Sequence, residues 1–440
     1  MDKFFKLQER GTTVSREVIG GITTFLAMSY ILAVNPGILS GTFAGAETGL
    51  AWGSVFTATA ISAAIGTLIM AFCANLPIAL APGLGLNAFF TYTVVLGMKC
   101  SPAFALTAVL FEGILFILLS VLGVREAIIK SIPLNLRKAV AVGIGLLITL
   151  IGLANGGIVS GDTGTLVGFV NFDIQHSEAI VAVIGLMITV ALYTLKVPGS
   201  ILIAIILTTI IGIPFGVTKL PENFSPISTP AAPHLFMFEW GSVLTLKFFV
   251  VFFTFLFTDL FDTIGTLLGV AEQANLKDEE GNVANAKGAL MSDAVATVAG
   301  ACLGTSTVTS FVESSSGVAA GARTGLASAV TALLFLVALF LSPLFALIPS
   351  AATAPALIFV GFLMMRGVTG IDFSDLSEGL PAFFTITAMP FSYSIAKGIL
   401  FGIISYVLCK IVTKKIREIP LVTWILAIVF LFDIIFEAVK

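Results

Sequence analysis

Charge is scarce in this chain. Charged residues make up 11% of its 440 residues, whereas soluble domains carry about 25%. Apolar residues make up 58%, and the mean hydropathy is +1.09. Apolar runs of about 20 residues, long enough to cross a bilayer, recur from end to end. These features predict an all-α polytopic membrane protein embedded in the lipid bilayer, with no large soluble domain.

Cysteine, histidine and basic clusters are also rare. Four scattered cysteines form no C-x-x-C pair, so they are predicted to act as small packing residues. They are Cys73, Cys100, Cys302 and Cys409. His176 and His234 sit alone in polar stretches, so neither a metal site nor a bound cofactor is expected. The net charge of −3 includes no basic patch of the kind that binds nucleic acid.

Apolar runs between charge and turn signals predict fourteen spans and one extra stretch. The spans are 18–39, 52–73, 78–97, 103–123, 138–154, 179–196, 198–217, 247–270, 286–303, 308–321, 324–347, 351–367, 380–395 and 396–412. The extra apolar stretch, 420–438, either crosses once more or lies along the membrane surface as a C-terminal helix. Its acidic residues, Asp433 and Glu437, leave that choice open.

Lysine and arginine positions orient the chain, because they concentrate on the cytoplasmic side. Three basic clusters share one side if fourteen spans cross. The clusters comprise Lys3, Lys6, Arg10 and Arg16; Arg125, Lys130, Arg137 and Lys138; and Lys410, Lys414, Lys415 and Arg417. We therefore expect a multi-pass protein of the cell membrane with a cytoplasmic N-terminus.

An internal repeat relates the two halves of the chain. Ile132-Pro133 opens the fifth span as Ile348-Pro349 opens the twelfth, and other short matches follow in the same order. Seven is an odd number of spans, so the second copy is inverted relative to the first. Inverted repeats with interrupted helices and a mid-membrane site are common in secondary transporters.

The repeat pairs the third span with the tenth, and both are unlikely to form unbroken helices. The third contains Pro77, Pro82, Gly83 and Gly85, which break or weaken a helix. The tenth overlaps the Gly-, Ser- and Thr-rich run 304–317. Irregular backbone is tolerated at membrane depth only where it lines a cavity or is buried in protein. These two breaks therefore predict the position of a transport site.

Carboxylates lie within or beside these segments. Glu313 stands in the broken tenth span, and its alternative role is a structural hydrogen bond to the freed backbone. Asp259 and Asp262 are three residues apart on one face of the eighth span, with Thr258 nearby. Two close carboxylates will not both stay ionised without partners, so one is a candidate proton carrier. The alternative is a capping or ion-paired aspartate.

Other polar residues are open to two interpretations. Asn87 could read a ligand edge or cap the helix that follows the break. Asp293 could orient the surroundings of Glu313 or serve as a helix cap. Glu112 lacks polar neighbours in the sequence and is predicted to be structural. Uncharged polar groups, carboxylates and flanking aromatics suit a planar, neutral, hydrogen-bonding solute better than an inorganic anion.

Four strings identify a family resemblance. They are GLGLNAFF at 83–90, TDLFDTIG at 258–265, SDA at 292–294 and GTSTVTSFVESSSG at 304–317. They resemble the adenine/hypoxanthine/guanine permease branch of the xanthine/uracil permease (nucleobase:cation symporter) family, over essentially the whole chain. The uracil and xanthine branch has Gln/Glu-Asn-x-Gly in the tenth span, whereas Glu313 is followed here by Ser-Ser-Ser-Gly. This departure favours the purine branch.

The resemblance implies fourteen spans in two inverted seven-span repeats, with short extended segments in spans 3 and 10. It implies a core domain formed by 1–123 and 246–348, and a gate domain formed by 124–245 and 349–440. It also implies proton-coupled uptake of a purine nucleobase by alternating access, and it allows a homodimer.

The resemblance also implies roles for individual residues. Asp259 and Glu313 would hydrogen-bond the base, with Asn87 and Gly85 opposite them and Ser314 in the same site. Asp262, Asp293 and Thr258 would support the polar site or take part in proton coupling.

Four other functions remain to be weighed, and the weakest of them is a channel, which coupling of uptake to a pH gradient would exclude. An anion transporter for sulfate or bicarbonate shares the broad fold, and a uracil or xanthine permease shares the family. The absence of a basic residue from the broken segments speaks against the anion transporter, since Arg323 lies beyond the tenth span. An enzyme is not expected, because no histidine in any predicted span could activate Ser314 to Ser316 as nucleophiles.

Overall fold

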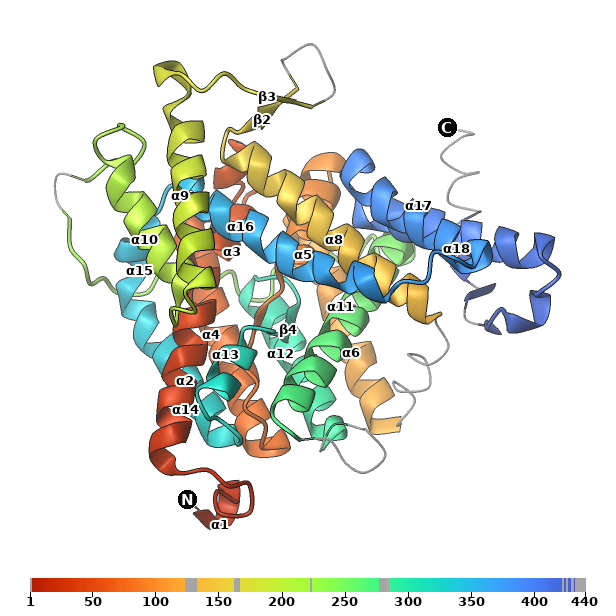
Figure 1. The fold of residues 1–440 in the computed structure, drawn as a ribbon, viewed down its shortest axis with the longest axis horizontal. Coiled ribbons are helices and arrows are strands. Elements are labelled where there is room, and N and C mark those ends of the chain that lie inside the picture. The colour runs from red at the N-terminus through yellow and green to blue at the C-terminus, as the bar shows by residue number, and fades with distance from the viewer. Residues whose placement is uncertain are drawn as a thin grey trace.

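The computed structural model describes residues 2–431, except 123–132, 162–166, 222–223, 277–282, 284, 422, 425 and 429–430. Helices make up most of it (Figure 1). Eight helices among these residues are long and apolar enough to cross a membrane. The chain is therefore a multi-pass helical membrane protein. Most of the predicted stretch 420–438, together with Arg125 and Lys130, lies outside the described residues.

The helices follow the predicted apolar runs closely. In the first half they are α1 Asp2–Phe5, α2 Val14–Met28, α3 Ile31–Leu39, α4 Trp52–Ile69, α5 Leu84–Ala88, α6 Pro102–Leu122, α8 Leu134–Asn155, α9 Ser177–Thr194 and α10 Ser200–Gly212. In the second half they are α11 Leu246–Gln273, α12 Ala286–Leu303, α13 Ser314–Ala319, α14 Gly325–Ala338, α15 Ser342–Ala346, α16 Ser350–Met365, α17 Leu376–Ser392 and α18 Ile395–Val412. The π-helical segments Met70–Ala74 and Phe89–Gly97 continue α4 and α5.

The first predicted span is confirmed, and two helices build it. Helix α2 ends at Met28 and α3 begins at Ile31. At the junction Leu32 N donates to Ser29 O and Ala33 N donates to Tyr30 O, both at 3.0 Å. These three-residue hydrogen bonds tighten the chain locally, as in a 3₁₀ turn. The junction carries Tyr30 to the centre of the molecule, where its side chain is 1% exposed.

The third and tenth predicted spans each contain a short extended segment, as expected. Strand β1 (Leu80–Pro82) pairs antiparallel with β4 (Val308–Ser310), and Ala81 lies opposite Thr309. Pro82 is the last residue of β1 and lies opposite Val308, and Gly83 N just beyond it still donates to Thr307 O at 3.1 Å. Helix α5 begins after β1 and Gly83, and α13 begins after β4 and Glu313. Two broken spans thus meet at their breaks.

Neighbouring helices satisfy the polar backbone of this strand pair. The Thr67 hydroxyl of α4 accepts from Leu80 N at 2.9 Å, and the Thr297 hydroxyl of α12 donates to Val308 O at 2.9 Å. Each unsatisfied backbone group in a membrane interior costs several kcal/mol. These threonines therefore make a two-stranded sheet possible within a helical membrane protein.

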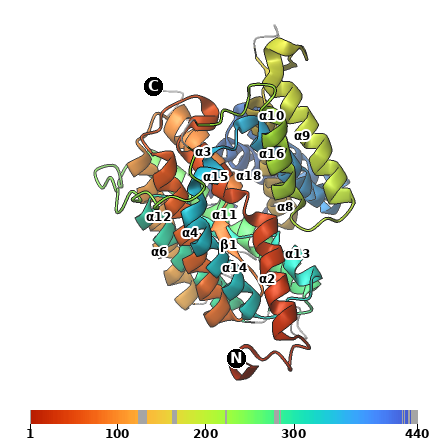
Figure 2. The same cartoon turned by 90° about the vertical axis from the view of Figure 1, so that its left-hand side faces the viewer.

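The helices pack in two groups. Helices α8, α9, α10, α16, α17 and α18 pack mainly on one another. The strand pair is surrounded by the other group, α2 to α6 and α11 to α14. Figure 2 shows α9, α10 and α16 on one side and α4, α6, α12 and α14 on the other. A separate hairpin, β2 (Val159–Ser160) with β3 (Gly168–Phe169), follows α8.

Candidate functional site

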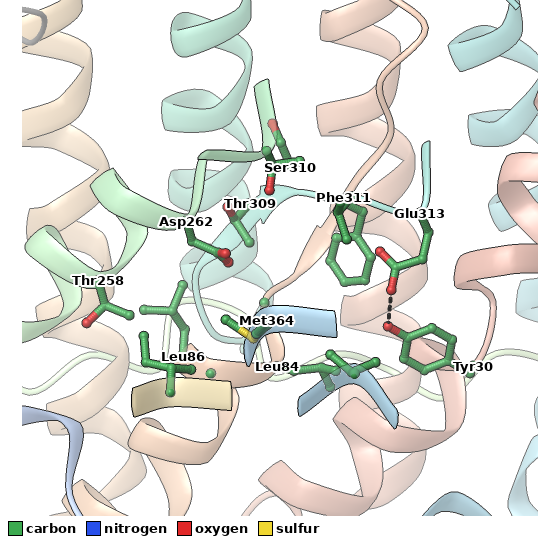
Figure 3. A pocket seen from close by; sticks show the side chains of 16 residues that line it. Tyr30, Leu84, Leu86, Thr258, Asp262, Thr309, Ser310, Phe311, Glu313 and Met364 are labelled. Carbon is green, nitrogen blue, oxygen red and sulfur yellow. Dashed lines mark hydrogen bonds between the residues drawn. The ribbon is translucent and has the colours of Figure 1, made fainter. Parts of the chain in front are cut away.

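A cavity lies where the strand pair meets both groups of helices. Its walls come from the α2–α3 junction, the segment from Gly83 into α5, helices α8, α11 and α16, and strand β4 with the segment after it (Figure 3). The lining residues are Tyr30, Gly83, Leu84, Gly85, Leu86, Ile144, Thr258, Asp262, Thr266, Thr309, Ser310, Phe311, Val312, Glu313, Val360 and Met364. No lysine or arginine is found among these described lining residues.

Glu313 presents its carboxylate to this cavity. It occupies the N-cap position of α13, but its side chain makes no capping hydrogen bond to that helix. The Tyr30 hydroxyl instead donates to Glu313 Oε1 at 2.6 Å (Figure 3). The Glu313 side chain is buried, at 9% exposure. The carboxylate therefore faces a tyrosine and a cavity. Its role in a site and its alternative role as a structural hydrogen-bond partner of the freed backbone both stay predictions.

Asp262 of α11 is the second carboxylate in the cavity wall. Figure 3 shows it beside Thr309, on the other side of the cavity from Tyr30. The hydroxyls of Thr258 and Ser310 are buried in the same wall and have no hydrogen-bond partner among the described residues. Buried polar groups are normally hydrogen-bonded, so these two hydroxyls indicate a site that a polar ligand or water completes.

Asp259 and Asp293 lie behind the cavity and are fully buried. The Thr263 hydroxyl lies 3.1 Å from Asp259 Oδ1, 2.9 Å from Asp293 Oδ1 and 2.8 Å from the Thr309 hydroxyl. Neither aspartate lines the cavity. The network therefore connects α11, α12 and β4 behind the wall that Asp262 and Thr309 present.

Three other predicted residues take part in holding the broken segments together or shaping the cavity. Asn87 is fully buried and accepts from the Ser306 hydroxyl, and it does not line the cavity. The Ser314 hydroxyl accepts from Ala79 N at 3.0 Å, so it joins α13 to the segment before β1. Gly85 lines the cavity, and a Cβ there would lie 2.7 Å from Ile144 Cγ2.

Glu112 is predicted to be structural, and it has a polar partner that its neighbours in the sequence do not reveal. The Thr307 hydroxyl donates to Glu112 Oε2 at 2.7 Å, and Glu112 is fully buried on α6. The sequence hid this contact because Thr307 belongs to the broken tenth span, 195 residues away. Glu112 thus contacts the strand segment from outside the cavity.

Tyr30 and Ser310 were not among the predicted site residues. Tyr30 could have been found by composition, because the chain has 5 tyrosines against 38 phenylalanines. A tyrosine at the centre of an apolar span adds a hydroxyl that must find a partner. Ser310 lies within the run 304–317, but nothing local distinguishes it from the other hydroxylated residues there.

A larger cleft between the two helix groups adjoins the cavity. The two share lining residues Asp262, Thr266, Val312, Glu313, Val360 and Met364. The cleft extends to Gln273 at the end of α11, Ala319 at the end of α13 and Arg366 just after α16. The cavity is therefore reached from one end of the molecule.

Comparisons with known proteins agree with this architecture. The Xan_ur_permease model of the Permease family matches residues 15–401. The guanine/hypoxanthine permease PbuG of Bacillus subtilis is 43% identical over 99% of this chain and 100% of its own length. The adenine permease AdeP of Escherichia coli is 40% identical over 99% of this chain and 96% of its own.

Solved structures show the same fold at low identity. The transmembrane domain of a cyanobacterial bicarbonate transporter, BicA, superposes with a TM-score of 0.66. It is 14% identical, and the match covers 88% of this chain and 97% of that one. This likeness concerns the fold alone. Family membership rests on the sequence matches, which cover nearly the whole chain: the protein is a permease, not an enzyme, and belongs to the adenine/hypoxanthine/guanine branch of the xanthine/uracil permease family.

Proposed function

We propose that this protein imports purine nucleobases by proton symport with alternating access. The observation that carries the proposal is the cavity in which Glu313 and Asp262 face a space beside two broken spans. Relatives similar along their whole length are named guanine/hypoxanthine and adenine permeases. Hypoxanthine and guanine are the first substrates to test, followed by adenine.

The cavity chemistry suits a neutral base. Ring N–H groups of a purine donate to carboxylate oxygens, and its ring nitrogens and carbonyl accept from hydroxyls. Glu313 and Asp262 supply the acceptors, and the unpartnered Thr258 and Ser310 hydroxyls supply groups of both kinds. An inorganic anion would face two carboxylates and no lysine or arginine among the described lining residues. An anion transporter is therefore disfavoured despite the shared fold.

The two α11 aspartates exchange their predicted roles in this proposal. Asp262 contacts the base, together with Glu313 and Thr258, because it lines the cavity. Asp259 and Asp293 support that wall through Thr263. Gly85 leaves space for the base, and Asn87 and Ser314 hold the broken segments. One of the cavity carboxylates takes up the coupling proton.

The helix packing supports two moving parts. We assign 1–123 and 246–348 to a core that holds the strand pair, and 124–245 and 349–440 to a gate. The whole would comprise fourteen spans in two inverted repeats, with the N-terminus in the cytoplasm of a cell-membrane protein. In this orientation, the chain runs toward the cytoplasm along α11, α13 and α16. The cleft is lined by Gln273, Ala319 and Arg366, which lie at or just after the ends of these helices, so it would open to the cytoplasm.

Uptake of labelled hypoxanthine in cells that lack their own purine permeases tests the proposal. We expect Glu313→Gln and Asp262→Asn to lower the initial rate at least tenfold at low substrate concentration. Losing a hydrogen bond to a charged group costs about 1.5–3 kcal/mol, which is roughly 10- to 150-fold. The matched control is Glu178→Gln, an exposed carboxylate of α9. All variants are compared at equal amounts in the membrane fraction.

Three results would contradict the proposal. Wild-type uptake in both cavity variants would remove Glu313 and Asp262 from the site. Competition of uptake by sulfate or bicarbonate but not by unlabelled purines would support the anion transporter. Stronger competition by uracil or xanthine than by hypoxanthine would show that the preferred substrate is not the proposed purine.

A further inference from the structure

Tyr30 lies in the wall of the proposed base-binding cavity, although it belongs to neither broken span. It follows α2 at the tightened α2–α3 junction. Its ring is 1% exposed, and its hydroxyl donates to Glu313 Oε1 at 2.6 Å. A buried hydroxyl that contacts a carboxylate so closely is a strong, directional constraint on that carboxylate.

Tyr30 holds one oxygen of Glu313, a residue that lines the cavity. Tyr30 bonds to Oε1, and the side chain makes no capping bond to α13. Figure 3 shows Tyr30 and Glu313 side by side, with Asp262 across the cavity. Glu313 has several side-chain torsions, and a single hydrogen bond selects among its rotamers. Tyr30 thus determines where Oε2 stands.

We propose that Tyr30 is a positioning residue that sets substrate specificity by aiming Glu313 Oε2 at one ring N–H of the bound base. This inference rests on the proposed function and adds a residue to it. A fixed acceptor discriminates between a ligand that carries the matching donor and one that lacks it, because the mismatch leaves a buried polar group unpaired. A mobile acceptor discriminates less, since it can turn away from the mismatch.

Methylated bases test this directly. The affinities of hypoxanthine, 1-methylhypoxanthine and 9-methylhypoxanthine are measured by competition against uptake of labelled hypoxanthine. In the wild type, we expect the analogue that lacks the recognised N–H to compete at least tenfold more weakly than hypoxanthine, since a lost bond to a charged group costs that much. In Tyr30→Phe, the affinity for hypoxanthine is expected to fall about tenfold, while the affinity for that analogue changes little.

The control is Tyr406→Phe. Tyr406 is a buried tyrosine of α18, at 3% exposure, outside the cavity lining. Its ring lies over Lys410, a contact that phenylalanine keeps. This variant is expected to retain the wild-type affinities for all three bases. If Tyr30 had a merely structural role, Tyr30→Phe would lower the affinities for all three bases by the same factor, and the ratios between these affinities would not change.

Each outcome has a separate meaning. Equal ratios in Tyr30→Phe and the wild type overturn the inference about Tyr30. Wild-type protein that takes up no purine at all overturns the proposed function instead. Competition constants do not depend on the amount of folded protein. A low yield of Tyr30→Phe therefore leaves the ratio measurable in cells.

Discussion

Thr263 shows how a single side chain organises the region behind the cavity. Its hydroxyl lies within hydrogen-bond distance of Asp259, Asp293 and Thr309. One hydroxyl has a single proton to donate, so the contacts depend on one another. Buried networks of this kind favour one arrangement of their members when all are satisfied. Thr263 therefore helps to place the wall that carries Asp262.

We predict that Thr263→Val lowers the thermal stability of the purified protein. Valine keeps the shape but removes the hydroxyl from two buried carboxylates. The expected loss is about 1.5–3 kcal/mol, because the lost bonds involve groups that can be charged. The fall in Tm is measured by a fluorescence melt in detergent.

Thr189→Val is the matched control. Thr189 is 1% exposed, and its hydroxyl donates to Gly185 O at 2.8 Å within its own helix. The same substitution at Thr189 removes one hydrogen bond to a backbone carbonyl that already accepts a hydrogen bond within the helix. The loss of stability is therefore expected to be smaller than for Thr263→Val. Equal melting temperatures for the two variants would show that the Thr263 network adds no stability.

The broken elements explain why the cavity has polar walls. The β1–β4 pair brings Gly83, Thr309 and Ser310 to the cavity, and no continuous helix could present backbone and hydroxyl groups at that point. At its far end, the broken third span contacts the other helix group. Asn155 Nδ2 of α8 donates to the Tyr92 hydroxyl at 3.1 Å, and Thr93 donates to Tyr393 O at 3.3 Å.

These contacts lie at the end of the span where, in the proposed orientation, the protein faces outward. The Tyr92 and Tyr393 rings also meet edge to face, with centroids 6.1 Å apart. The cleft reaches Gln273 and Ala319, which end spans on the opposite side. We therefore expect the Tyr92 contacts to favour the state that is open to the cytoplasm.

Tyr92→Phe is predicted to shift the protein toward the outward-open state. One hydrogen bond between neutral groups contributes about 0.5–1.5 kcal/mol, so the shift is about two- to tenfold. The readout is labelling of Ala319→Cys, in a background without the four native cysteines, by an impermeant maleimide added from the cytoplasmic side. The rate is expected to fall. An unchanged or faster labelling rate would show that the Tyr92 hydrogen bond does not hold the outward side closed. Tyr406→Phe in the same background is the control.

At the scale of the whole molecule, two helix groups enclose one cavity, and each supplies part of its wall. Ile144, Val360 and Met364 come from the group of α8 and α16, whereas the polar residues come from the other group. Movement of one group past the other would therefore change access to the carboxylates without changing the positions of the polar residues relative to one another. This division is the physical basis of the proposed alternating access.

Proton coupling is tested with the whole protein in sealed vesicles. An inside-alkaline pH gradient is expected to raise the initial rate of hypoxanthine uptake several-fold, because a proton and a base enter together. A protonophore should abolish the increase. Uptake that follows an imposed sodium gradient and ignores the pH gradient would replace the proton with sodium as the coupling ion.

The class of protein and most of its helices were predictable from the sequence, because burial in a bilayer demands long apolar runs. The predicted span 286–303 matches α12, Ala286–Leu303, at both ends. The sequence also located the breaks in the third and tenth spans, since proline, glycine and clustered hydroxyls act locally on the backbone. The xanthine/uracil permease family likewise followed from linear strings such as 304–317.

Which side chains meet depends on how distant segments pack in three dimensions. Asp259 and Asp262 lie about 60° apart around their helix, so periodicity places both on one face without choosing between them. The choice depends on α12 and β4, which enclose Asp259 and leave Asp262 in the cavity. Tyr30 and Glu313 are separated by 283 residues. Their contact arises from packing between distant segments, which local sequence patterns do not encode.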